Sequence, residues 1–303
     1  MRILVTGASG LLGANLALEA AKDHTVFGLV NSLNLHPTAF QVLQGDLAEA
    51  GMIEAVLDHT QPDWVIHCAA LANVDACEND PARAVQLNTE VPRKLAQHVA
   101  RGGARLVHVS TDAVFDGVKG NYVENDPPNP LSVYARTKLE GERAVAETDP
   151  EAIIGRVNLF GWSPSGKRSL AEWFFNNLGA GKAVMGFTDV YFCPLLANDL
   201  GNLFLAMLQK QLHGLYHVVA RDSLSKYAFG VKLANLFNFD AGLIRPTSVN
   251  DSGLAAPRSP NLTLNTDKLT QALGVPPPTI QQGLNSFNRL YEEKYPQRLR
   301  EML

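Results

Sequence analysis

Tyr134 and Lys138 are the residues whose types and spacing point most directly to catalysis. On a helix, residues four apart lie on one face, so the phenol and the ammonium group can converge on one point. A free phenol has a pKa of about 10, and a nearby positive charge lowers that pKa by favouring the phenolate. Tyr134 could then exchange a proton with a carbinol or ketone oxygen near neutral pH. Since this spacing also arises by chance, the position of the pair in the fold decides its meaning.

Thr111 is the third candidate for chemistry, because it follows an apolar segment, residues 105–110, that reads as a buried strand. Parallel α/β sheets bind ligands at the carboxyl ends of their strands, so Thr111 should lie close to the helix that carries Tyr134. Its hydroxyl would then hydrogen-bond the same substrate oxygen as Tyr134. The alternative is a hydroxyl that only caps the end of the strand.

A glycine-rich segment with the spacing GxxGxxG follows the first predicted strand, residues 3–6. Its first glycine allows a tight turn, its second lets backbone N–H groups approach a pyrophosphate, and its third lets a helix pack close to the sheet. The partial positive charge at the start of that helix also favours an anion. The alternative is a tight turn with close packing and no ligand. We expect a dinucleotide on this loop, bound by Gly7, Ser9, Gly10, Leu11, Leu12 and Gly13.

Three later segments are expected to bind the rest of the dinucleotide. Asp46, followed by Leu47, ends the third strand and could meet the adenine amino group or cap a helix that begins at Ala48. The small apolar segment after the fourth strand suits a close approach to a ribose and consists of Ala69, Ala70 and Leu71. Lys138 would hold the nicotinamide ribose hydroxyls, and an oxidised nicotinamide ring would lower the pKa of Tyr134 further.

The end of the second strand, residues 28–32, indicates which nicotinamide cofactor is bound. An acidic residue there would bind a ribose 2′-OH, and a basic residue would bind a 2′-phosphate. Asn31 is the expected contact, and this segment has neither an acidic nor a basic residue. Because no carboxylate would repel a phosphate, the sequence favours NADP(H) and leaves NAD(H) open.

The apolar pattern predicts the elements that position these residues. Continuous apolar runs separated by helices are typical of a parallel sheet covered on both faces, so the fold class is α/β with a doubly wound (Rossmann) sheet and a smaller C-terminal α/β region. The predicted strands are residues 3–6, 25–30, 40–44, 64–68, 105–110, 152–157 and 215–219, and the helices are residues 11–22, 48–59, 81–101 and 132–147.

The predicted division assigns residues 1–157 to the cofactor domain, with residues 190–219 returning to it. Residues 158–189 and 220–303 form the substrate-binding region. Residues 118–132 are predicted to be a long loop, and residues 161–166 a mobile one. His67 and His108 are expected in the core, whereas Asn88 could brace the active-site strand or lie at the surface.

Composition excludes several classes of function. The formal net charge is −4 without blocks of like charge, which argues against a nucleic-acid partner. Cys68, Cys77 and Cys193 have no metal-ligand spacing, so we expect no metal, and so few cysteines suit a reducing cytoplasm. No signal peptide and no run of about 18 apolar residues is present, so we expect a soluble cytoplasmic protein without a membrane partner.

Together these motifs resemble the dTDP-4-dehydrorhamnose reductase family, sugar-nucleotide members of the extended short-chain dehydrogenases/reductases. The segments that carry the resemblance are the glycine loop and residues 110–117, 122–126, 130, 134–142, 198–200, 258–262 and 267–269. The resemblance implies NAD(P)H-dependent reduction of a nucleotide-linked 4-keto-6-deoxysugar in carbohydrate biosynthesis, with Thr111, Tyr134 and Lys138 catalytic. Thr111 would also contact the substrate, Arg258 could pair with a pyrophosphate, and a homodimer is the default assembly.

Ala113 separates this sequence from related activities. Sugar-nucleotide 4,6-dehydratases carry Glu and GDP-fucose synthases carry Cys at this position, so the simple reduction of a ketone is favoured here. Ala113 and Ala135 also replace the Tyr and Gly common in the reductase family, so substrate contacts can differ. Two alternatives stay open: a sugar-nucleotide epimerase with a tightly held cofactor, and a non-catalytic NADP-binding regulatory subunit, since the β subunit of methionine adenosyltransferase resembles the same family.

Overall fold

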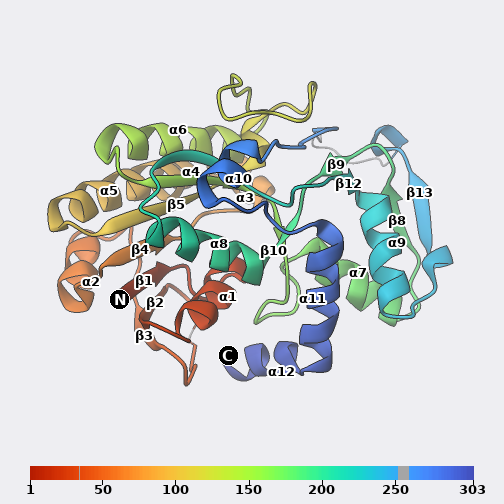
Figure 1. Cartoon of the computed structure of the whole chain (residues 1–303), viewed down its shortest axis with the longest axis horizontal. Coiled ribbons are helices and arrows are strands. Elements are labelled where there is room, and N and C mark those ends of the chain that lie inside the picture. The colour runs from red at the N-terminus through yellow and green to blue at the C-terminus, as the bar shows by residue number, and fades with distance from the viewer. Residues whose placement is uncertain (34, 252–258) are drawn as a thin grey trace.

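A computed structural model describes residues 1–33, 35–251 and 259–303 of the chain (Figure 1). Seven strands, all paired in parallel, form the central sheet in the order β11-β6-β5-β4-β1-β2-β3. Their bounds are β1 (Arg2–Thr6), β2 (Thr25–Val30), β3 (Gln41–Gln44), β4 (Trp64–His67), β5 (Arg105–Thr111), β6 (Ile153–Val157) and β11 (Gly214–Val218). The chain moves outward from β1 to β3 and then crosses back to β4, so a switch in strand order lies between β1 and β4. Ligands of doubly wound folds bind at such a switch.

Helices cover both faces of this sheet, which confirms the predicted fold class (Figure 1). One face holds α1 (Leu11–Ala20) and α8 (Ala197–Gln209), which approach closely because Gly201 of α8 lies against Leu16 of α1. The other face holds α2 (Met52–Thr60), α5 (Val91–Gly102) and α6 (Val133–Thr148). Most residues of β1, β2, β4 and β6 are buried, which explains their continuous apolar sequences.

The described elements after β6, apart from α8 and β11, form the smaller α/β region, much of which lies at the right of Figure 1. Its strand β8 (Val184–Phe187) pairs in parallel with β13 (Ile244–Thr247). One hydrophobic cluster continues from the sheet into this region, with Phe160 packed edge-on against Phe229 and Phe287. The remaining strands are β7 (Leu159–Phe160), β9 (Tyr191–Phe192), β10 (Leu195–Leu196) and β12 (Leu224–Ser225), and the helices here are α7 (Leu170–Gly179), α9 (Lys226–Leu236), α10 (Asp267–Leu273), α11 (Ile280–Glu292) and α12 (Tyr295–Glu301).

Two predicted segments differ in detail from the structure. The helix expected over residues 81–101 is three consecutive pieces, α4 (Pro81–Val85), a π-helix (Gln86–Glu90) and α5, and an additional helix, α3 (Val74–Asn79), precedes it. Residues 161–166 are irregular as predicted, but residues 161–164 are buried, and Trp162 stacks on Phe287 with ring centroids 3.9 Å apart. This packing argues against the mobility predicted there. None of the described helices is both long and apolar enough to span a membrane.

The C-terminal helix α12 is tied to α1 through buried polar groups. The Tyr295 hydroxyl donates a hydrogen bond of 2.8 Å to Asn15 Oδ1, and Asn15 Nδ2 donates to the carbonyl oxygens of Leu11 and Trp162. Asn15 is fully buried, so none of these partners can be replaced by bulk water.

We expect Tyr295→Phe to lower the free energy of unfolding by about 1–3 kcal/mol, because the change leaves Asn15 Oδ1 buried without its donor. Urea denaturation followed by circular dichroism measures the difference. Tyr291→Phe is the matched control, since the Tyr291 hydroxyl has no hydrogen-bond partner among the described residues. Equal stability of the two variants would show that the Tyr295–Asn15 contact does not hold α12 in place.

Candidate active site

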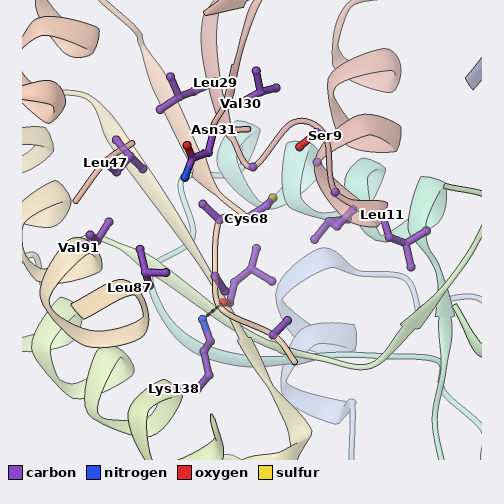
Figure 2. Close-up of a pocket in the computed structure, with 18 of the residues that line it drawn as sticks. Ser9, Leu11, Leu29, Val30, Asn31, Leu47, Cys68, Leu87, Val91 and Lys138 are labelled. Atoms are coloured by element: carbon purple, nitrogen blue, oxygen red, sulfur yellow. Dashed lines mark hydrogen bonds between the residues drawn. The ribbon is translucent and has the colours of Figure 1, made fainter. Parts of the chain in front are cut away.

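A cavity of about 460 Å³ lies at the carboxyl edge of the sheet and is lined from the ends of β1, β2, β4, β5 and β6 (Figure 2). It brings together almost all the residues predicted to bind cofactor or act in catalysis. They are Gly7, Ser9, Gly10, Leu11, Leu12, Gly13, Asn31, Asp46, Leu47, Ala69, Ala70, Thr111, Tyr134 and Lys138. Leu71 is the exception among the described ones, and Arg258 lies outside the described residues.

The glycine loop has the geometry expected of an anion site. Gly7 has φ +68°, and a Cβ at Gly13 would stand 2.2 Å from the Gly7 carbonyl oxygen, so neither position accepts a side chain without rearrangement. Gly10 is the N-cap of α1, and no side chain in the described part of the chain caps this helix. Its first N–H groups are therefore available to a ligand, and they fit the pyrophosphate of a dinucleotide.

Asp46 lies at the far end of the cavity and is held by two partners. Its Oδ1 accepts the Ala48 N–H at 2.9 Å, and its Oδ2 pairs with Arg83 Nη2 at 2.8 Å. Burial raises the pKa of Asp46, but these hydrogen bonds outweigh burial and hold the pKa below its ordinary value. The helix-cap alternative is wrong, because α2 begins at Met52 with Gly51 as its N-cap. Arg83 was not predicted, since its partner is 37 positions away in the sequence.

Thr111, Tyr134 and Lys138 meet where β5 ends beside α6. The Ser132 hydroxyl accepts the Ala135 N–H and caps α6, which puts Tyr134 in the first turn of the helix and Lys138 one turn later. Lys138 Nζ donates a hydrogen bond of 2.7 Å to the carbonyl oxygen of Val109 in β5 (Figure 2). The ammonium group is thus fixed to the strand that ends in Thr111.

The ionisation of this pair differs from the expectation for Tyr134. Burial raises the pKa of Tyr134 to about 12, and the negative charge of Asp112 adds to the increase. The neighbouring Thr111 hydroxyl lowers the pKa, but by less than burial raises it. Burial lowers the pKa of Lys138 to about 8, against an upward contribution from Glu142. The prediction that Lys138 makes Tyr134 acidic is therefore wrong for the chain by itself, in which Tyr134 stays protonated at neutral pH.

Asn88 is a positioning residue whose role was left open by the sequence. Its Oδ1 accepts the Leu71 N–H at 2.9 Å, and its Nδ2 donates to the Leu71 carbonyl oxygen and to Thr137 Oγ1, both at 3.1 Å. Asn88 is fully buried in the π-helix, so it braces the loop after β4 against α6 and does not lie at the surface.

A buried ionic cluster lies behind Thr111. Glu142 of α6 pairs with Arg156 of β6, with Nη2–Oε2 at 2.8 Å, and accepts the Ser110 hydroxyl of β5 at 2.5 Å. The side chains of Glu142 and Arg156 are 6% and 3% exposed, and the Arg156 guanidinium lies over the Phe115 ring. This cluster joins α6, β5 and β6 at the point from which the catalytic residues project.

The two predicted core histidines and Asp112 complete the surroundings of the site. His67 and His108 are buried and stacked 5.6 Å apart, and burial lowers the pKa of both, that of His67 to about 3, so they are neutral. Asp112 accepts Asn158 Nδ2 at 2.6 Å and the Thr111 hydroxyl at 3.2 Å. Burial raises the pKa of Asp112 to about 6, so this carboxyl ionises close to neutral pH.

The parallel sheet, the glycine loop after β1 and the Tyr134–Lys138 pair on α6 together define an extended short-chain dehydrogenase/reductase. Residues 1–292 match the family described as RmlD substrate binding domain, and the chain belongs to this family. The predicted resemblance to dTDP-4-dehydrorhamnose reductases is thereby confirmed.

Individual relatives cover nearly the whole chain. A probable low-salt glycan biosynthesis reductase, Agl14, of Haloferax volcanii is 32% identical over 97% of this chain and 99% of its own length. The methionine adenosyltransferase 2 subunit beta of Danio rerio is 33% identical over 88% of this chain and 84% of its own length. The structure of a dTDP-4-dehydrorhamnose reductase from Bacillus anthracis, solved in complex with NADP, superimposes with a TM-score of 0.81 at 25% identity, covering 94% of this chain and 98% of that one.

We expect Glu142→Gln to lower the free energy of unfolding by about 3 kcal/mol, because it leaves the Arg156 charge buried without its counter-charge. Guanidinium denaturation measures the loss. Glu140→Gln removes the same charge from an exposed position on the same helix and should change stability by less than about 0.5 kcal/mol. Indistinguishable midpoints for the two variants would contradict a structural role for the cluster.

Proposed function

We propose that this chain is an NAD(P)H-dependent reductase of a nucleotide-linked 4-keto-6-deoxysugar, of the dTDP-4-dehydrorhamnose reductase type. The observation that carries the proposal is the convergence of Thr111, Tyr134 and Lys138 with the glycine loop on one cavity. Family membership supports the same activity.

NADP(H) is the favoured cofactor of this reaction, and NAD(H) is possible. Its pyrophosphate would lie on the uncapped start of α1, its adenine near Asp46 and Leu47, and its nicotinamide ribose against Lys138. Asn31 at the end of β2 leaves no carboxylate to repel a 2′-phosphate. The Bacillus anthracis reductase solved with NADP supports this choice.

Tyr134 is the proton donor of the reduction. The bound dihydronicotinamide supplies the hydride for the keto carbon. A phenol whose pKa is raised to about 12 is fully protonated at neutral pH, so Tyr134 holds the proton that the ketone oxygen needs. The Thr111 hydroxyl orients that oxygen, and the Lys138 ammonium stabilises the phenolate left after proton transfer.

In this proposal the substrate is bound by the smaller region, residues 158–189 and 220–303, from which Leu159 and Arg168 line the cavity. Ala113 supplies no acid or base at the position where 4,6-dehydratases carry Glu and GDP-fucose synthases carry Cys, which favours a single reduction over epimerisation or dehydration. A regulatory subunit is the second candidate, because the Danio rerio relative is named as a subunit of an adenosyltransferase.

Tyr134→Phe should reduce NADPH oxidation with dTDP-4-dehydrorhamnose about 10²–10⁴-fold, because the substrate oxygen loses its proton donor. The decrease in NADPH absorbance measures turnover. Tyr191→Phe is the control, since Tyr191 is exposed and does not line the cavity. Unchanged turnover in Tyr134→Phe would rule out this mechanism. Sugar conversion without net NADPH consumption would favour the epimerase, and cofactor binding without conversion would favour the regulatory subunit.

The rate of reduction should fall as the pH rises through about 8. Lys138 has a pKa lowered to about 8, so its stabilising charge is present below that pH and is lost above it. Profiles of kcat/KM against pH test this, with Lys138→Arg as the informative variant because its guanidinium stays charged. An alkaline decrease that is the same in the wild type and in Lys138→Arg would show that another group controls it.

A further inference from the structure

Arg168 is a cation of the cavity that the proposed mechanism does not use. It lines the cavity together with Leu11 and Leu12, the first residues of α1. Its guanidinium makes no hydrogen bond or ion pair with the rest of the described chain. Arg168 and Lys138 are the two basic residues among those that line the cavity in the described structure, and Lys138 is bonded to β5.

The backbone of Arg168 is held in place by a fully buried carboxylate. Glu172 of α7 accepts the N–H groups of Ser163, Arg168 and Ser169 at 2.6, 2.8 and 3.1 Å, and the Ser163 hydroxyl at 2.9 Å. Ser169 and Glu172 also form a capping box at the start of α7. The loop over residues 163–169 is therefore folded around Glu172, with the side chain of Arg168 left free.

The same loop is attached directly to the glycine helix. Asn15 of α1 donates from Nδ2 to the Trp162 carbonyl oxygen at 2.8 Å, and the Ser169 hydroxyl donates to the Gly161 carbonyl oxygen at 2.7 Å. The loop that carries Arg168 is thus attached to α1, and Arg168 lines the same cavity as Leu11 and Leu12 at the uncapped start of that helix. An unpaired guanidinium with five N–H donors and a row of backbone N–H groups both prefer the same kind of ligand, a phosphorylated anion.

We propose that Arg168 binds a diphosphate group at the mouth of this cavity. The inference rests on the proposed function, in which two diphosphates meet here: the pyrophosphate of NADPH and the diphosphate of the nucleotide-sugar. Arg168 clamps the bound diphosphate from the side of the loop, while the start of α1 binds through backbone N–H groups. Glu172 acts as the positioning residue for this clamp.

Isothermal titration calorimetry of the whole chain shows whether Arg168 binds the diphosphate of the cofactor or that of the substrate. The probes are NADPH, dTDP and adenosine 2′,5′-bisphosphate, which carries phosphates but no diphosphate. If Arg168 binds the diphosphate of the cofactor, Arg168→Gln should weaken NADPH binding about tenfold to a hundredfold. If Arg168 binds the diphosphate of the substrate, the same substitution should weaken dTDP binding by the same factor. Arg168→Lys should recover part of the loss, and binding of adenosine 2′,5′-bisphosphate should stay within twofold of the wild type.

Lys167→Gln is the matched control, because it removes the same charge from the neighbouring exposed residue, which does not line the cavity. NADPH and dTDP affinities that both stay within twofold in Arg168→Gln would overturn the proposal and leave the reductase intact. An equal loss for adenosine 2′,5′-bisphosphate would overturn it too, since Arg168 would then recognise a phosphate monoester. A wild-type chain that binds neither NADPH nor dTDP would instead overturn the proposed function, and this inference with it.

Discussion

The attachment of α6 to β5 is the contact on which the site depends. Tyr134 and Lys138 belong to the helix, Thr111 belongs to the strand, and no covalent neighbour holds them together. They are aligned by two sets of contacts. Lys138 donates a hydrogen bond to the Val109 carbonyl oxygen, and Glu142 binds both Ser110 of β5 and Arg156 of β6. Gly141 makes the close approach possible on the other side, because a Cβ there would stand 2.2 Å from the Asn88 carbonyl oxygen. Without this attachment the three functional groups would have no fixed geometry.

Burial sets the chemistry that this geometry can perform. The same removal from water raises the pKa of Tyr134 to about 12 and lowers that of Lys138 to about 8, so the pair is a protonated phenol beside a readily neutralised ammonium group. That state suits proton donation to a ketone, which is the direction of a reductase. His67 and His108 are neutral and add no charge of their own, so the charges near the site are those of Lys138, Asp112 and the Glu142–Arg156 pair.

Local sequence was sufficient to predict the parts of the structure that local chemistry determines. Residues 25–30 were predicted as a strand with its observed bounds, because β2 is an uninterrupted apolar run. The turns of the glycine loop and the shared face of Tyr134 and Lys138 follow from glycine stereochemistry and helical periodicity.

The parts that were missed depend on partners remote in sequence. Arg83 bonds Asp46, and Arg168 reaches the cavity because Glu172 and Asn15 hold its loop. The role of Asn88, which the sequence left open, is decided by its hydrogen bonds to the backbone of Leu71. The pKa of Tyr134 depends on burial, which no spacing reveals.

The central claim is that the chain transfers a hydride from the cofactor to C4 of the sugar, and an isotope measurement tests it most directly. NADPH carrying deuterium in place of both hydrogens at C4 of the dihydronicotinamide would be incubated with the chain and dTDP-4-dehydrorhamnose, and the product sugar analysed by mass spectrometry and NMR. The account predicts one deuterium, located at C4 of the sugar, for each NADPH oxidised. A product without deuterium, or a sugar left as the ketone while NADPH stays bound and intact, would contradict it.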